Sequence, residues 1–158
     1  MKNRELYVLE RSAAILYDSE ECVVISLNKT YSEKKKENVQ IYSSKSLSGI
    51  RNLKAQVRTC AGVIFKNKNN YVLTHAVWEY NQENLKGLLK RILNLSIMDT
   101  GKNPDEVFLC TTYPEEQYEE AIYEILEDVD LKKFRKYNGK LGVLKQNIAI
   151  GKDVLSFY

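Results

Sequence analysis

Two β-rich runs separated by an asparagine-rich turn place the strongest constraint on what this chain can fold into. The runs are residues 56–65 and 71–78, and the segment between them reads Lys66-Asn67-Lys68-Asn69-Asn70. Asparagine tolerates the left-handed backbone conformation that tight hairpin turns require. The sequence therefore predicts a β-hairpin, and with it an antiparallel sheet on which the other elements must pack.

Further strands are predicted before this hairpin. Residues 6–9 and 13–17 are apolar or aromatic, and a polar turn at 18–21 separates them from a third apolar run at 22–27. This pattern is typical of strand, turn and strand. For the rest of the N-terminal part we expect a polar connector at 29–38, a short strand at 39–42, and a loop or short helix at 43–55.

Two amphipathic helices are predicted after the hairpin. Asn81 can cap the first helix, and leucine and isoleucine residues between 85 and 93 recur at helical spacing. Residues 106–110 read as a buried strand. Pro114 suits the first turn of the second helix, whose apolar pattern ends near Asn138-Gly139. One to three strands are expected at the C-terminal end, over residues 141–144, 147–150 and 154–157.

This order of elements predicts an α+β fold: a mixed, mostly antiparallel, sandwich-like sheet with two main helices packed on it. A chain of 158 residues can bury a sizeable core as a single domain. With 44% hydrophobic and 28% charged residues, the composition is that of an ordinary globular protein.

Charge and cysteine usage exclude several kinds of site. The net charge is only +3, and the basic run Lys34-Lys35-Lys36 is flanked by Glu33 and Glu37, so we expect no nucleic-acid partner. The three cysteines lack the CxxC spacing of zinc sites and are accompanied by a single histidine, so neither a metal nor a disulfide scaffold is expected. No glycine-rich phosphate loop is present, and no cofactor is expected.

Hydropathy predicts no membrane insertion, because no apolar run approaches the ~20 residues of a membrane span and no cleavable signal peptide is evident. We therefore expect a cytoplasmic protein, or one exported into a host cell without a cleavable signal peptide. The sequence does not define the oligomeric state.

The candidate site lies in the predicted hairpin, which carries Cys60 and the only histidine of the chain, His75. A two-residue turn at Asn67-Lys68 would pair Lys66 with Asn69 and set Cys60 directly opposite His75. Directly opposed residues have Cβ atoms ~4.5–5.5 Å apart, within reach of an imidazole and a thiol. With any other register we expect two ordinary core strands, because a one-residue slip turns a side chain to the other face.

A cysteine next to a histidine can act as a nucleophile. The imidazole takes the thiol proton, and the resulting thiolate–imidazolium pair lowers the effective pKa of the cysteine. Gly62 would leave room on the same face for a substrate carbonyl. The alternative is packing, because buried cysteines are usually inert and a strand histidine is often a core residue. For Cys22 and Cys110, which lie in more apolar runs, we favour a packing role.

A cysteine on one strand, a histidine about fifteen residues later on the next, and then helix, strand, helix and terminal strands resemble the chemoreceptor glutamine deamidases. The same order resembles the catalytic domains of cytotoxic necrotizing factor and Burkholderia lethal factor. The resemblance divides the single domain into an N-terminal β-rich extension, residues 1–50, and a deamidase-like core, residues 51–158. It implies that Cys60 is the nucleophile and His75 the general base and acid of a protein glutamine deamidase.

The partner implied by the resemblance is a protein that presents an exposed glutamine. The N-terminal extension, which the compact chemotaxis enzymes would not need, favours a bacterial effector or toxin. The chain departs from the family in carrying Arg58-Thr59 before Cys60 and Lys54 where several members have a catalytic threonine. Thr59, Thr112 or a backbone carbonyl could orient His75, so the third catalytic group stays unknown. The alternatives are a non-catalytic α+β protein-interaction module and a small cysteine protease or transamidase.

Overall fold

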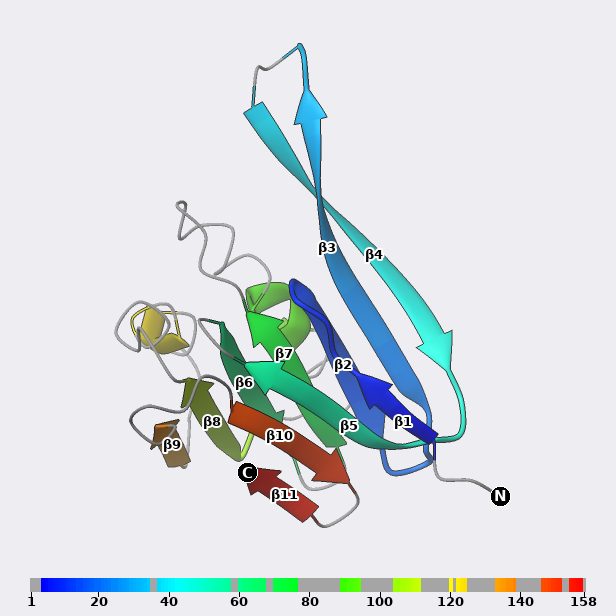
Figure 1. Cartoon of the computed structure of the whole chain (residues 1–158), viewed down its shortest axis with the longest axis vertical. Helices are drawn as coiled ribbons and strands as arrows, with labels where there is room; N and C mark the ends of the chain where they lie inside the picture. The colour runs from blue at the N-terminus through cyan, green and yellow to red at the C-terminus, as the bar shows by residue number, and fades with distance from the viewer. Residues whose placement is uncertain are drawn as a thin grey trace.

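The structure is a computed structural model whose described residues form two packed β-sheets and two short helical segments (Figure 1). The described residues are 4–34, 37–57, 60–67, 70–76, 89–94, 104–111, 120, 122–124, 133–138, 146–151 and 154–157.

The larger sheet has seven strands in the order β4-β3-β2-β7-β6-β8-β9. The only parallel pair among its described strands is β8 with β9, and the other neighbours are antiparallel. The bounds of these strands are β2 Ser12–Tyr17, β3 Cys22–Ser32, β4 Glu37–Leu47, β6 Ala61–Lys66, β7 Asn70–Ala76, β8 Glu106–Thr111 and β9 Lys133–Asn138.

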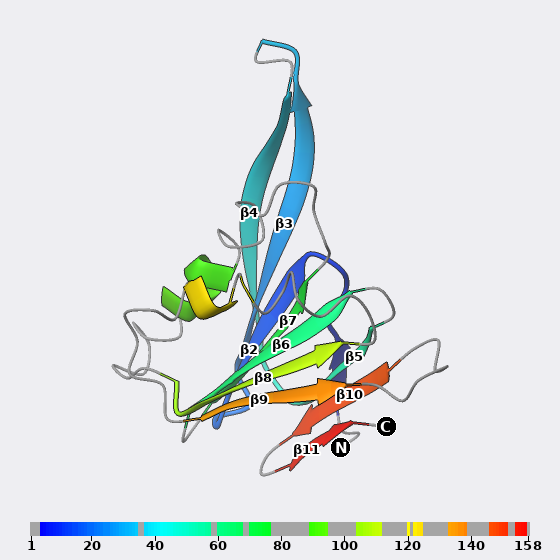
Figure 2. The same ribbon diagram turned by 90° about the vertical axis from the view of Figure 1, so that its left-hand side faces the viewer.

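The smaller sheet has four strands in the order β1-β5-β10-β11, so it joins both ends of the chain to its middle (Figure 2). Strand β1 runs parallel to β5, whereas β10 is antiparallel to both of its neighbours. The bounds are β1 Arg4–Tyr7, β5 Ile50–Val57, β10 Gln146–Gly151 and β11 Val154–Phe157.

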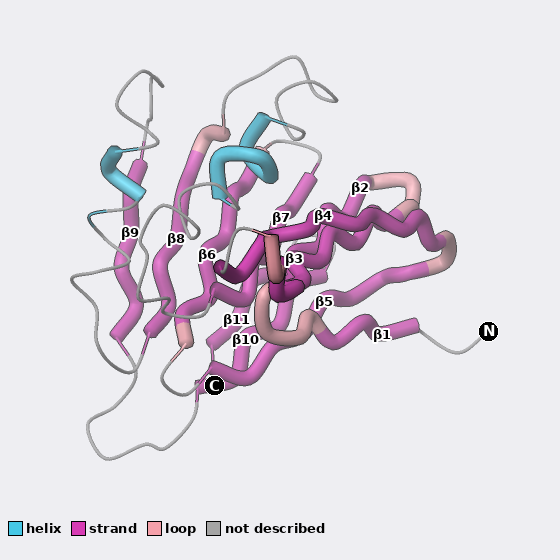
Figure 3. Tube along the Cα trace, turned by 90° about the horizontal axis from the view of Figure 1, so that it is seen from above, coloured by secondary structure: helices cyan, strands magenta, loops and turns pink. Residues whose placement is uncertain are grey.

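The layers follow from the alternation of side chains along strand β6. Val63 and Phe65 pack on one face of the large sheet with Leu89, Ile92 and Ile122 of the helical segments. Ile64 packs on the opposite face, against the small sheet. Figure 3 shows the helical segments on one side of the large sheet and the small sheet on the other. The predicted α+β class is confirmed.

None of the described helices is long and apolar enough to cross a membrane.

Three local predictions were wrong, because strand pairing outweighed local composition. The expected connector and loop of the N-terminal part are instead the long hairpin β3–β4 and strand β5. The serine-rich stretch of β4 forms the exposed edge of the large sheet, where polar residues fit a strand well. The expected end of the second helix near Asn138 is strand β9. The predicted strand at 141–144 lies outside the described residues.

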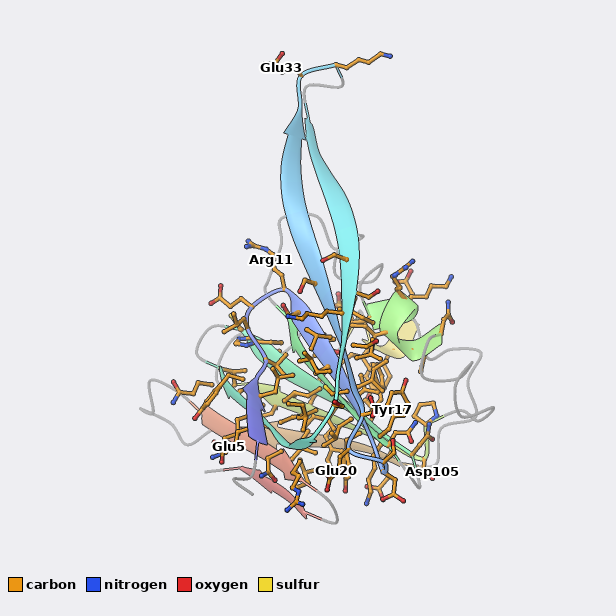
Figure 4. The ribbon with its side chains drawn as sticks, turned by 90° about the vertical axis from the view of Figure 1, so that its right-hand side faces the viewer. Glu5, Arg11, Tyr17, Glu20, Glu33 and Asp105 are labelled. Atoms are coloured by element: carbon orange, nitrogen blue, oxygen red, sulfur yellow. The ribbon has the colours of Figure 1, made fainter. Side chains whose placement is uncertain are left out.

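The hairpin β3–β4 extends beyond the rest of the sheet. Strand β2 pairs with β3 only from Cys22 to Ser26, whereas β3 and β4 pair with each other as far as Ser32 and Glu37. Figure 4 shows Glu33 at the tip of this hairpin, far from the sandwich. Whatever the hairpin does, its tip is remote from the space between the sheets.

The hairpin β6–β7 exists as predicted, but its register differs. Asn67 and Asn70 exchange backbone hydrogen bonds of 3.0 and 3.4 Å, and Gly62 lies opposite His75. The predicted pairing of Lys66 with Asn69 is therefore wrong, since Lys66 pairs with Tyr71. The change is two residues, which preserves the face to which each side chain points. The expectation that any other register would separate Cys60 from His75 is therefore also wrong, since their side chains still lie within 4.8 Å of each other.

Gly62 lies where strand β10 of the small sheet packs on the large sheet. A Cβ atom at Gly62 would overlap Cδ1 of Ile148, a fully buried residue of β10. The space that the sequence assigned to a substrate carbonyl is therefore filled by Ile148. Glycine at this position allows β10 to pack directly on β6.

We expect Gly62→Ala to reduce the free energy of unfolding by ~1–3 kcal/mol, because the added methyl group collides with Ile148. Ile148→Val removes the colliding Cδ1 atom and alone should cost ~1 kcal/mol. Urea unfolding of both single variants and the double variant tests the contact. The double variant should lose ~1 kcal/mol less than the two single variants lose together. A loss equal to that sum would contradict the close contact.

Candidate functional site

The candidate site lies at one end of the space between the sheets, where three segments meet. His75 lies next to the last residue of β7, and Cys60 immediately precedes β6. The third segment is the connection between β1 and β2, residues 8–11, which we call the β1–β2 loop. Figure 4 shows Arg11 in this loop, at the beginning of β2. The site thus combines the predicted hairpin with a segment about 50 residues earlier in the chain.

The orientation of the His75 imidazole is defined by a buried hydrogen bond. Its Nδ1 atom lies 2.8 Å from the carbonyl oxygen of Val8. A carbonyl oxygen can only accept, so Nδ1 carries the proton, and in the neutral imidazole Nε2 carries the free lone pair. Nε2 is buried and has no hydrogen-bond partner among the described residues. His75 is therefore held as a base whose basic nitrogen is unsatisfied.

The β1–β2 loop is anchored to both sheets. The Val8 amide donates to the carbonyl of Lys54 in β5 at 2.8 Å, and the Arg11 amide donates to the carbonyl of His75 itself at 3.0 Å. Arg11 adopts a positive φ of 61°, a conformation that costs a non-glycine residue ~1–2 kcal/mol. The loop is thus bent sharply at the point where it contacts the histidine. Such strain is often found where a functional group must be oriented.

Cys60 and Glu10 complete the site. The Cys60 thiol donates to Oε1 of Glu10 at 3.6 Å, and Sγ, a Glu10 carboxylate oxygen and a ring nitrogen of His75 all lie within 4.8 Å of one another. Cys60 and His75 are 5% and 6% exposed, whereas Glu10 is exposed to solvent. A buried thiol and a buried imidazole are thereby gathered beside an exposed carboxylate.

The structure brings Cys60 and His75 together, but in a different register from the predicted one. Cys60 is the diagonal neighbour of His75, because Gly62 takes the directly opposed position. Diagonal neighbours lie ~7–8 Å apart at Cα, which an imidazole can bridge. The backbone carbonyl that orients His75 belongs to Val8. The other candidates for this role, Thr59 and Thr112, lie outside the described residues.

Glu10 was missed by the sequence analysis. It is a charged residue in a polar turn, 50 positions from Cys60, and no motif connects the two. The only available signal was its place between two predicted strands, where a loop reaches the edge of a sheet. Loops of this kind carry functional groups more often than the strands they connect.

The two other cysteines are packing residues, as the sequence favoured. Both are fully buried between the sheets, and burial raises the pKa of Cys22 to about 11 and that of Cys110 to about 12. Both therefore remain protonated thiols throughout the neutral range. The difference in setting distinguishes them from Cys60, which has a carboxylate and an imidazole beside it.

Neither a model of a known protein family nor any curated protein sequence gives a significant match to the chain. The functional argument therefore depends on the geometry of the site.

The buried thiols predict a loss of stability at alkaline pH. The pKa values of both thiols are raised in the folded protein. The stability that the protonated thiols contribute is therefore fully present below about pH 9 and is lost as the pH rises toward the folded pKa values. At about pH 10.5 each of the two thiols should lower the free energy of unfolding by ~2 kcal/mol relative to about pH 8. Urea unfolding of Cys22→Ala and Cys110→Ala should show a smaller alkaline loss than the parent protein, and identical losses would contradict ionisation of these thiols on unfolding.

Proposed function

We propose that this protein is a cysteine-dependent hydrolase of side-chain amides, a protein glutamine deamidase with Cys60 as nucleophile and His75 as general base and acid. The observation that carries the proposal is the state of His75. Its Nδ1 proton is held by the Val8 carbonyl, its Nε2 is buried without a hydrogen-bond partner among the described residues, and one of its two ring nitrogens lies within 4.8 Å of the Cys60 thiol. A base with a defined tautomer beside a potential nucleophile is the arrangement that nucleophilic catalysis requires.

In the first half of the reaction, Cys60 Sγ attacks the carboxamide carbon of a glutamine side chain, and the thiol proton moves to Nε2 of His75. The tetrahedral intermediate then collapses, and the bond between carbon and the amide nitrogen breaks. His75 returns the proton to that nitrogen, so ammonia leaves and a thioester of Cys60 remains. The backbone carbonyl of Val8 keeps the ring in position and stabilises the imidazolium that forms transiently.

In the second half, water attacks the thioester while Nε2 of His75 accepts its proton. The bond between carbon and sulfur breaks, the proton returns to Sγ, and a glutamate side chain is released. The net reaction consumes one amide and one water and yields one carboxylic acid and one ammonia. No cofactor is required, because both steps use acid–base and nucleophilic chemistry alone.

The electrostatics of Glu10 favour one part of this cycle and oppose another. Its carboxylate accepts from the Cys60 thiol at 3.6 Å, so it disfavours a free thiolate. The same negative charge favours the imidazolium that appears when His75 has taken a proton. A nucleophile that loses its proton only during attack is consistent with both effects. Because Glu10 is exposed, it also marks the side from which a glutamine side chain would enter.

The first test is alkylation of the native protein by iodoacetamide across the pH range. We expect Cys60 to react at neutral pH and His75→Ala to slow this reaction at least about tenfold, because the imidazole then no longer accepts the thiol proton during attack. Cys22 and Cys110 should stay unlabelled until the protein unfolds and serve as internal controls. Labelling of Cys60 that rises only near about pH 8.5 and is indifferent to His75→Ala would contradict the proposed nucleophile.

The second test identifies the reaction without assuming a substrate. The protein is incubated with a cytosolic protein extract, and peptides are compared by mass spectrometry with those from Cys60→Ser. Conversion of glutamine to glutamate raises the peptide mass by about one dalton, because NH2 is exchanged for OH. We expect such conversions to depend on both Cys60 and His75.

Three other outcomes of this experiment favour the alternatives. New chain termini would indicate a cysteine protease, and glutamine–lysine cross-links would indicate a transamidase. The absence of any change dependent on Cys60 would favour a non-catalytic interaction module, in which the two residues only pack. We also propose that the protein acts in the cytoplasm or, as an effector, inside a host cell. An extract of host cells is therefore a suitable source of substrates.

A further inference from the structure

The same cluster has the properties of a metal site, which the sequence did not indicate. From the arrangement of Glu10, Cys60 and His75 we infer that the protein binds one Zn²⁺ ion with these three side chains as ligands, and that the bound ion blocks Cys60. Zinc in proteins prefers thiolate, imidazole and carboxylate ligands, and sites with three protein ligands leave a fourth position for water. Catalysis by Cys60 is not needed for this binding.

The distances suit a zinc ion after small side-chain movements. With bond lengths of about 2.0–2.3 Å, the ligand atoms of a tetrahedral zinc site lie about 3.3–3.7 Å apart. In this structure the three atoms already lie within 4.8 Å of one another, and the thiol and carboxylate are 3.6 Å apart. Glu10 is exposed and lies in a loop, so its carboxylate can make the remaining adjustment.

His75 supplies an independent argument for a ligand. Its Nε2 atom is buried without a hydrogen-bond partner among the described residues, although the residue is only 6% exposed. Leaving a buried polar atom unsatisfied is costly, and a ligand at Nε2 would relieve that cost. Metal-binding histidines almost always donate their other ring proton to a carbonyl or carboxylate. The Nδ1 hydrogen bond to the Val8 carbonyl is an interaction of this kind.

Charge balance favours a divalent cation over water or an anion. When the Cys60 thiol transfers its proton to solvent, the thiolate and the Glu10 carboxylate carry two negative charges beside a neutral imidazole. A buried thiolate beside a second negative charge is costly, and a divalent cation neutralises both charges. The sulfur ligand selects zinc over magnesium and calcium, which prefer oxygen.

A bound ion would occupy the sulfur lone pair that attacks a substrate and the nitrogen that accepts the proton. Zinc and substrate would therefore compete for the same two residues. The expected consequence is reversible inhibition, with Cys60 protected from alkylation while the ion is bound.

The test uses the full chain, freed of metal by a chelator, and titrates it with Zn²⁺ by calorimetry and with Co²⁺ by absorption. We expect one ion per chain and a thiolate-to-cobalt charge-transfer band. Cys60→Ser should abolish the band, and His75→Gln and Glu10→Gln should each weaken binding at least about tenfold. Cys22→Ser is the matched control, because it removes a buried cysteine of the same core and should leave binding unchanged.

Circular dichroism of each variant separates loss of a ligand from loss of the fold, and Glu10→Gln is the safest variant because the residue is exposed. Binding that is unchanged in Cys60→Ser and Glu10→Gln, or equally strong for Mg²⁺, would overturn the inference.

The result can be separated from that of the proposed function. If Zn²⁺ does not bind while alkylation of Cys60 still depends on His75, only the metal site is refuted. If Zn²⁺ binds through the three residues but the metal-free protein shows no His75-dependent reactivity, the metal site stands and the proposed nucleophile is refuted. Amide hydrolysis that requires added zinc would support the site and overturn the role of zinc as an inhibitor.

Discussion

The hydrogen bond from His75 Nδ1 to the Val8 carbonyl is the interaction on which the site depends. It determines which ring nitrogen carries the lone pair, and it joins a strand of the large sheet to the loop that leaves the small sheet. The same Val8 residue donates its amide to Lys54 of β5, so its peptide groups link both layers. Because the acceptor is a backbone atom, no side-chain substitution at residue 8 can remove it directly. Its position is set by the path of the loop, including the left-handed turn at Arg11.

The sequence predicted the elements whose signals are local. The hairpin β6–β7, strands β2 and β8, and the apolar faces of both helical segments follow from periodicity over a few residues. Strand β4 was predicted only as a short strand at 39–42, and β5 was not predicted, because their residues are polar or mixed. Their strand conformation follows from pairing with distant segments. Pairing of this kind is a property of the whole fold and leaves little trace in the local composition.

The site was predictable in part for the same reason. In an antiparallel hairpin the numbers of paired residues have a constant sum, and Cys60 and His75 share a face whenever that sum is odd. The observed pairing differs from the predicted one by two residues, so the sum is still odd and the two side chains still share a face. Their exact relation depends on which asparagines close the turn, and five consecutive polar residues do not define that. Val8 and Glu10 reach the site through contacts 67 and 50 positions apart in the chain. Separations of this size cannot be inferred without the fold.

Gly62 connects the packing of the sheets to the chemistry at their rim. Because it has no side chain, Ile148 of β10 can approach β6 at a point directly opposite His75. Strand β10 pairs with β5, and β5 pairs with β1, so this contact joins β6 to the sheet from which the β1–β2 loop leaves. The loop after β1 then reaches His75 with its Val8 carbonyl and Cys60 with its Glu10 carboxylate. Any side chain at position 62 would have to displace the Cδ1 atom of Ile148. The His75 ring and the loop that orients it are thus held by two sheets that pack against each other at Gly62.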